Sequence, residues 1–190
     1  MKATCALVLV VSLGIAELRG QEAPPAVRAM DAGAVEACNH GRVSSTSFRA
    51  LVESFDPEHV VVHVETGVVR IFGTAGATRL VGTAGHWRYV RITVDPDLPL
   101  DERTAVIAHE LQHAREIADA AAVTQNQVRQ LFERIGRPVQ GAVDTYETAG
   151  AITAGMRVWR ELRATAARTR AMARALKTVP EPPIAVVRVQ

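Results

Sequence analysis

The pattern of hydrophobic and polar residues divides the chain into a strand-rich first half and a helix-rich second half. Residues 60–65 and 87–94 are rich in β-branched side chains, which is typical of strands, and residues 79–82 can form a short strand between them. Residues 44–55 place apolar side chains at helical spacing ahead of these strands. This order predicts a small sheet preceded by a short helix.

Helical periodicity dominates the second half of the chain. After a proline-rich turn, a helix is expected with Asp101 as its N-cap. Residues 124–135 form a short amphipathic helix or extend the preceding one, and residues 145–177 form a long helix. Gly150 and Gly155 are small enough to let the long helix pack closely against the helix that begins near Asp101. The pattern predicts an α+β fold, with a small N-terminal β-sheet packed on a helical half.

The N-terminus has the composition of a secretion signal. Lys2 precedes nearly unbroken apolar sequence at residues 6–15, and small residues suited to cleavage follow between residues 16 and 23. A membrane span needs about 20 apolar residues, so no stable span is expected here. We therefore expect a secreted or periplasmic protein after cleavage, or a membrane-tethered one if the signal is retained.

Length and charge bound the class of protein. The net charge of +2 implies no strong attraction to nucleic acid. The last part of the long helix is basic, and such a run is usually a solvated face, with contact to anionic lipid or a partner as the alternative. The predicted division is a signal peptide at residues 1–20, a mobile lead-in at 21–43, a single domain at 44–179 and a C-terminal tail at 180–190.

The strongest chemical signal is the HExxH motif at residues 109–113. On a helix, residues four apart share one face with Cβ atoms roughly 5 to 6 Å apart, so His109 and His113 can bind one metal ion. Glu110 can reach a metal-bound water and take its proton as a general base. Zinc lowers the pKa of bound water to about 7, so the motif predicts a site for one zinc ion that works at neutral pH.

A catalytic zinc usually has three protein ligands, so one more is needed. Asp119 points away from the metal if the helix continues past His113. Glu116 lies three residues after His113, where it can hydrogen-bond an imidazole N–H, ligate the metal itself, or be an ordinary solvated residue. Glu133 is a further acidic residue without a matching context. Cys38 and the nearby His40 make no complete ligand set.

Glu147 is the strongest candidate for the third ligand. It lies 34 residues after His113, near the start of the long helix, and an antiparallel helix would bring it beside the two histidines. The combination resembles the gluzincin metallopeptidases, in which HExxH is followed by a Glu on a downstream helix, in a pattern such as ExxxA. Glu147 and Ala151 match that pattern. The resemblance covers a quarter to a third of the chain.

The resemblance implies an extracytoplasmic zinc-dependent peptidase with a zincin-like domain. His109, His113 and Glu147 would bind the zinc ion, and Glu110 would activate water for attack on a peptide or protein substrate. The alternative is a non-catalytic secreted domain that uses the same helix pair for structural zinc binding or for binding a partner.

The sheet supplies further candidates. In zinc peptidases with this arrangement, an exposed sheet edge near the metal holds an extended peptide by main-chain pairing. Residues 87–94 are the candidate for that edge, with a buried central position as the alternative. His86 and Tyr89 are candidate donors to a transition-state oxyanion, with packing or edge roles as the alternative. His63 fits a strand residue better than a ligand.

Overall fold

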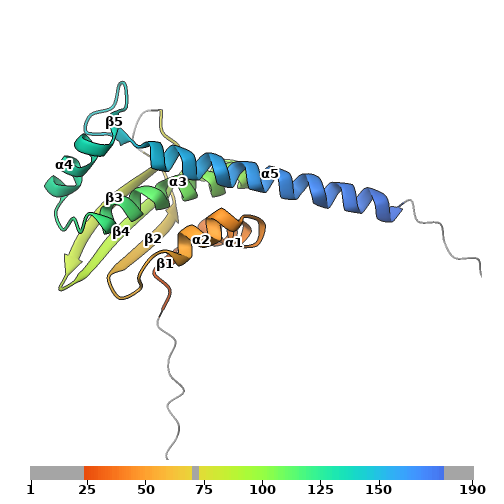
Figure 1. Cartoon of the computed structure of the whole chain (residues 1–190), viewed down its shortest axis with the longest axis horizontal. Helices are drawn as coiled ribbons and strands as arrows, with labels where there is room; N and C mark the ends of the chain where they lie inside the picture. The colour runs from red at the N-terminus through yellow and green to blue at the C-terminus, as the bar shows by residue number, and fades with distance from the viewer. Residues whose placement is uncertain (1–23, 70–72, 178–190) are drawn as a thin grey trace, which may run out of the picture.

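The structure is a computed structural model, and it describes residues 24–69 and 73–177. It has the predicted α+β architecture, with a four-stranded sheet packed against helices (Figure 1). The elements are β1 (Val27–Ala29), α1 (Ala32–Ser44), α2 (Thr46–Glu53), β2 (Val60–Thr66), β3 (Gly76–Ala84), β4 (Trp87–Val94), α3 (Leu100–Asp119), α4 (Gln125–Ile135), β5 (Arg137–Pro138), β6 (Tyr146–Glu147) and α5 (Ala149–Lys177). The expected signal peptide and C-terminal tail lie outside the described residues.

The main sheet is mixed, with strand order β1-β2-β4-β3. β1, β2 and β4 are parallel, whereas β3 pairs with β4 in the antiparallel sense through a tight hairpin. Gly85 in that hairpin has φ +60°, a conformation that L side chains rarely adopt. The antiparallel return makes β3 the edge strand beside α3, so β4 occupies the central position and residues 87–94 do not form the edge.

One face of the sheet is buried beneath the helices. Along β4, Val90, Ile92 and Val94 are buried, while Arg91 between them is exposed. This alternation is what a half-buried strand requires, because successive side chains point to opposite faces. Helices α1 and α3 cover the buried face, and both contact β2. The hydrophobic core therefore lies between the sheet and these helices.

Helices α3 and α5 pack side by side, as Figure 1 shows. A Cβ atom placed on Gly155 would lie 3.2 Å from the carbonyl oxygen of Ala105 and 3.2 Å from Cβ of His109. A Cβ on Gly150 would lie 2.8 Å from Oε1 of Glu116. The two glycines thus allow the close approach that the sequence predicts, and they bring α5 against the helix that carries the HExxH motif.

The range 21–43, expected to be a mobile lead-in, contains β1 and most of α1. Asp31 caps α1, because its Oδ1 accepts a hydrogen bond of 2.9 Å from the N–H of Ala34. The buried face of α1 consists of Ala34, Ala37, Cys38 and Gly41. These side chains are small, so the hydrophobic pattern of the helix is faint in the sequence.

Two predicted helix starts are wrong. Helix α3 begins at Leu100 with Pro99 at the N-cap position, so Asp101 lies in the first turn and is not the N-cap. Oδ1 of Asp101 lies 2.8 Å from Nε2 of His40, at hydrogen-bonding distance. Helix α5 begins at Ala149 instead of residue 145, because Tyr146 and Glu147 pair with β5 as a short strand. Helix α4 is separate from α3, and Thr124 starts it with a capping box.

No helix in the described ranges is long and apolar enough to cross a bilayer.

Candidate metal centre

Helix α3 places the two histidines of the motif on one face. The ring centroids of His109 and His113 lie 5.0 Å apart, and His113 also packs edge-on against Phe132 of α4 at 5.3 Å. His113 is buried, whereas His109 is partly exposed. The helix continues without a break to Asp119, as predicted. One rigid element therefore holds both imidazoles at a fixed spacing.

Glu147 joins the histidines from the short strand β6. Its Oε1 lies 3.0 Å from Nε2 of His109 and 3.4 Å from Nε2 of His113. One ligand atom from each of the three residues lies within 4.8 Å of the other two, so the group could hold a metal ion. The predicted trio comes together, but Glu147 lies two residues ahead of α5 and not on the helix that the ExxxA match implies.

The donor set fits zinc. Two imidazole nitrogens and one carboxylate oxygen are common zinc ligands, with bonds of about 2.0 to 2.2 Å. Around a tetrahedral ion, such bonds place neighbouring ligand atoms about 3.3 Å apart. The two measured distances from Glu147 to the histidine nitrogens, 3.0 and 3.4 Å, agree with that spacing.

Glu116 orients His113 from the side opposite Glu147. Its Oε2 lies 3.1 Å from Nδ1 of His113, which is the hydrogen-bonding position that the sequence allowed for it. Its Oε1 accepts a 2.8 Å hydrogen bond from the hydroxyl of Thr148. With Nδ1 bonded to Glu116, the imidazole keeps its proton there and presents Nε2 to a metal.

Thr148 connects this network to Glu147. Its hydroxyl oxygen also accepts a 3.1 Å hydrogen bond from the N–H of Ala151, as an N-cap of α5 does. Its own N–H donates to Oε1 of Glu147 at 3.1 Å. On the other side, the backbone of Glu147 pairs with that of Arg137 in the two-stranded sheet of β5 and β6. The position of Glu147 therefore depends on contacts from α3, α5 and β5 together.

The charges of the cluster stabilise one another. Burial opposes the charged form of His113, but hydrogen bonds with Glu116 and Glu147 outweigh it and raise the pKa of His113 to about 9. Burial would raise the pKa of Glu147, yet its hydrogen bonds with His109 and His113 hold that pKa at about 2. The cluster is thus built to stabilise positive charge beside an ionised Glu147.

Glu110 is buried between α3 and the edge strand. The hydroxyl of Thr78 lies 2.7 Å from Oε2 of Glu110 and 2.9 Å from its carbonyl oxygen. A Cβ on Gly76 would lie 2.7 Å from Oε1, so only glycine leaves room for this carboxylate. Burial raises the pKa of Glu110, although His113 and Thr78 act in the opposite direction. The net effect is a pKa of Glu110 above that of an exposed glutamate, so this carboxyl binds a proton more readily.

These residues border a cavity of about 990 Å³. The edge strand β3 and residues 73–75 before it form one wall, and helices α3, α4 and α5 together with residues 139 and 144–147 form the rest. Its lining includes a group of apolar side chains from α4 and α5: Val128, Phe132, Met156 and Trp159. The cavity is large enough for several residues of a polypeptide.

The outer edge of β3 faces this cavity with main-chain groups. The carbonyl of Ala75 accepts a hydrogen bond from the N–H of Asp95, so it points inward, toward the β4 side of the sheet. The carbonyl of Leu80 accepts one from the side chain of Gln125 in α4, so it points outward, away from β4. Main-chain groups alternate between the two sides along an antiparallel strand. The N–H and C=O groups of Gly76 and Thr78 therefore point outward, toward the cavity.

Other predicted candidates lie elsewhere. His86 sits at the tip of the β3–β4 hairpin, with its ring 5.2 Å from that of Trp87. Tyr89 is on the central strand β4, and neither residue lines the cavity. Asp119 forms a 2.7 Å ion pair with Arg115, away from the cluster as expected. Glu133 accepts from the hydroxyl of Tyr146 at 3.4 Å and does not join the metal-binding group.

The two remaining candidates from the sequence are structural. Burial raises the pKa of the Cys38 thiol to about 11, which leaves it protonated on the core side of α1. His63 pairs in register with Arg91 within the sheet.

The sequence analysis missed Thr78 and Thr148. Each contacts a carboxylate of α3 across a separation of 32 residues. A threonine in a strand or before a helix is common, so no local signal marks either one.

No family model matches the chain, and neither a curated protein nor a solved structure is found that matches it. The likeness to gluzincins therefore remains one of motif and site residues.

Proposed function

We propose that this protein is an extracytoplasmic zinc-dependent peptidase of gluzincin type. The observation that supports this most is the convergence of His109, His113 and Glu147 next to the buried Glu110. The cavity beside them borders an edge strand with outward main-chain groups. A metal-binding trio, a proton carrier and a place for an extended peptide are the parts that peptide hydrolysis requires.

Zinc bound by the trio would act as a Lewis acid that lowers the pKa of water and polarises the scissile carbonyl. Glu110 takes a proton from the attacking water and later delivers it to the leaving amine. The hydroxyl of Thr78 holds Oε2 of Glu110, which leaves Oε1 to exchange the proton. The raised pKa of Glu110 suits this double role, because a group with a pKa nearer the working pH both accepts and releases protons readily.

The substrate is a peptide or protein that binds in extended form along β3. Main-chain pairing with Gly76 and Thr78 would fix its direction while tolerating many side chains. The apolar lining residues Phe132 and Trp159 would accept a large apolar side chain of the substrate.

One experiment tests both the metal and the chemistry. The mature protein is purified, its zinc content is measured, and hydrolysis of a broad peptide library is compared with that of Glu110→Gln. We expect one zinc ion per chain, and about 10²- to 10⁴-fold slower hydrolysis by the variant, as for loss of a general base. Asp119→Asn, a change to an exposed acid on the same helix, is the control and should leave the rate unchanged. Equal rates for Glu110→Gln and the wild type would rule out the mechanism.

A non-catalytic zinc domain is the second candidate function. Its support is the hydrogen-bond network of Glu116 and Thr148, which ties α3 to the start of α5 at the cluster, so that a metal here would also stabilise the fold. Under this alternative the purified protein retains zinc, melts at a lower temperature after chelation and cleaves no peptide of the library.

Export of the protein is part of the proposal. It rests on the signal-like composition of residues 1–20. N-terminal sequencing of the protein recovered from a fractionated culture would test it, with a mature start between residues 17 and 24 as the expected result.

A further inference from the structure

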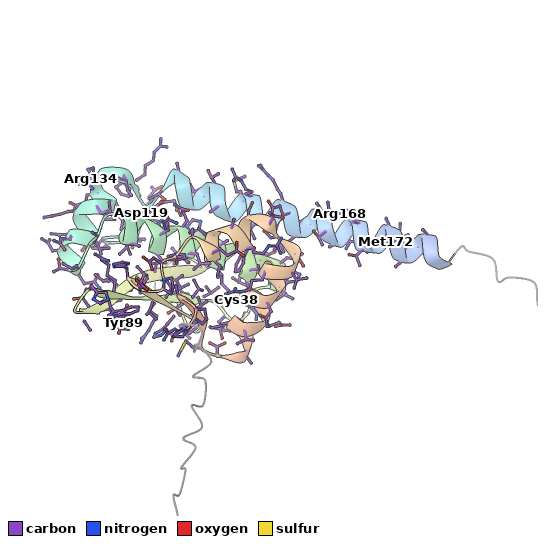
Figure 2. The ribbon with its side chains drawn as sticks, turned by 60° about the horizontal axis from the view of Figure 1, so that its bottom comes forward. Cys38, Tyr89, Asp119, Arg134, Arg168 and Met172 are labelled. Carbon is purple, nitrogen blue, oxygen red and sulfur yellow. The ribbon has the colours of Figure 1, made fainter. Side chains whose placement is uncertain are left out.

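The second half of α5 extends beyond the rest of the described structure. Glu161 accepts hydrogen bonds from Ser45 and Ser47, and Thr165 donates to the carbonyl of Ser44 at 3.1 Å, so α5 is tied to the junction of α1 and α2 as far as Thr165. Every residue from 167 to 175 is exposed. Figure 1 shows this part of the helix projecting, and Figure 2 labels Arg168 and Met172 on it.

This projecting helix has a basic stripe on one side. At about 100° per residue, Arg163, Arg170 and Arg174 fall within an arc of roughly 40°. We call these three residues the basic stripe. All three are exposed, and no acidic residue follows Glu161 in the helix. None of the three forms an ion pair with a carboxylate of the described residues. The stripe therefore presents an uncompensated positive charge to solvent.

The basic stripe is continuous with the candidate active site. The guanidinium of Arg163 lies over the ring of Trp159, 5.1 Å from its centroid. Trp159 and Met156 line the cavity, and both fall on the same side of α5 as the stripe. From Arg163 to Arg174 the helix rises about 16 Å, which equals the length of about five residues of extended polypeptide. A chain bound in the cavity can therefore continue along the stripe.

The composition of the helix favours a polypeptide over a lipid surface. Helices that lie in a membrane interface need large apolar residues on the face opposite their charges. Between residues 164 and 175 the only large apolar side chain is Met172, and the rest are Ala, Thr and Arg. Such a helix attracts negative charge but has little apolar surface to insert.

We propose that the basic stripe is a docking surface for an acidic segment of the polypeptide that occupies the cavity. The statement that this polypeptide is a substrate rests on the proposed peptidase function. The docking itself requires only the complementary charge, since opposite charges on neighbouring surfaces speed encounter and favour one partner over another.

Binding is tested on the full mature protein with a fluorescein-labelled peptide of ten glutamates, followed by fluorescence anisotropy. We expect Arg170→Gln/Arg174→Gln to weaken binding roughly three- to tenfold, as for loss of two exposed ion pairs. The matched control is Arg157→Gln/Arg168→Gln, which removes the same charge from another face of α5 and should change binding less than twofold. Raising the salt concentration should weaken binding to the wild type, because exposed charges are screened.

Three results would overturn the proposal. They are equal weakening by the two double variants, no binding of the peptide by the wild type, and binding of phosphatidylglycerol vesicles through Arg170 and Arg174 without any binding of the peptide. Hydrolysis of the broad peptide library is measured separately with the same proteins. Binding of the acidic peptide without hydrolysis of the library would contradict the peptidase function and leave the docking surface in place. Hydrolysis without binding through the basic stripe would contradict the docking surface and leave the peptidase function in place.

Discussion

The two sides of the candidate metal cluster are built in different ways. His109 and His113 lie on one buried helix, where a spacing of four residues determines their separation. Glu147 lies in a strand of two residues that ends the connection between α4 and α5. Its place depends on backbone pairing with Arg137 of β5 and on hydrogen bonds around Thr148. The histidine side is therefore rigid by helix geometry, and the glutamate side is held by a short strand pairing and by hydrogen bonds that reach from Thr148 to α3.

Loss of a ligand should have the largest effect. His109→Ala and Glu147→Ala each remove one of the three proposed ligands, and we expect the zinc affinity to fall more than 100-fold, beyond the 10- to 100-fold typical of outer hydrogen-bond partners. Competition titration with a zinc chelator measures this, and Asp119→Ala is the control that should bind as the wild type does. Unchanged affinity in Glu147→Ala would contradict the assignment of Glu147 as the third ligand.

A change at Gly136 should disturb the junction between α4 and the glutamate side. A Cβ at this position would lie 2.8 Å from the carbonyl of Phe132 and 3.2 Å from that of Glu147, so Gly136→Ala must move the end of α4 relative to the β6 backbone. We expect zinc affinity to fall roughly 10-fold while the helix content seen by circular dichroism stays constant. Gly82→Ala is the matched control, because a Cβ there meets nothing within 4 Å. Wild-type affinity in Gly136→Ala would show that the glutamate side tolerates movement.

The smallest expected effect concerns pH and the metal-free protein. The pKa of His113 rises from 6.5 to about 9 on folding, so protonated His113 stabilises the fold fully below pH 6.5, and this contribution is lost as the pH rises through 9. The pKa of Glu147 falls from 4.5 to about 2, so its contribution is present above pH 4.5 and is lost as the pH falls through 2. Without metal, the cluster therefore stabilises the fold most between pH 4.5 and 6.5.

Thermal melts in the presence of a chelator test the direction of this pH dependence of stability. We expect the melting temperature to fall by a few degrees between pH 6 and pH 9.5, and His113→Gln should remove most of that decrease. With saturating zinc, the melting temperature should instead rise between pH 6 and pH 8, because protons compete with the metal for the histidines. A metal-free melting temperature that rises from pH 6 to pH 9.5 would contradict the charge arrangement of the cluster.

The sequence predicted the elements whose patterns are strong. β2 and β4 alternate or cluster β-branched residues, and α4 has a capping box with a clear apolar face. Helix α1 was missed because its buried residues are the small Ala, Cys and Gly, so no large apolar side chains at helical spacing mark its buried face. Strand β3 proved longer than predicted, and its place at the edge depends on a hairpin return that periodicity does not encode.

The sequence by itself determined the histidine pair and its neighbour Glu110, because helix geometry converts their spacing directly into a shared face. It also favoured Glu147 over Asp119, since a continuous helix turns Asp119 away from the metal. Only the tertiary structure decided that Glu147 reaches the histidines from a strand, that Thr78 holds Glu110 and that His86 and Tyr89 lie outside the cavity. The contacts of Glu147 with the histidines and of Thr78 with Glu110 join residues 32 to 38 positions apart, and contacts at such separations depend on how the whole chain packs.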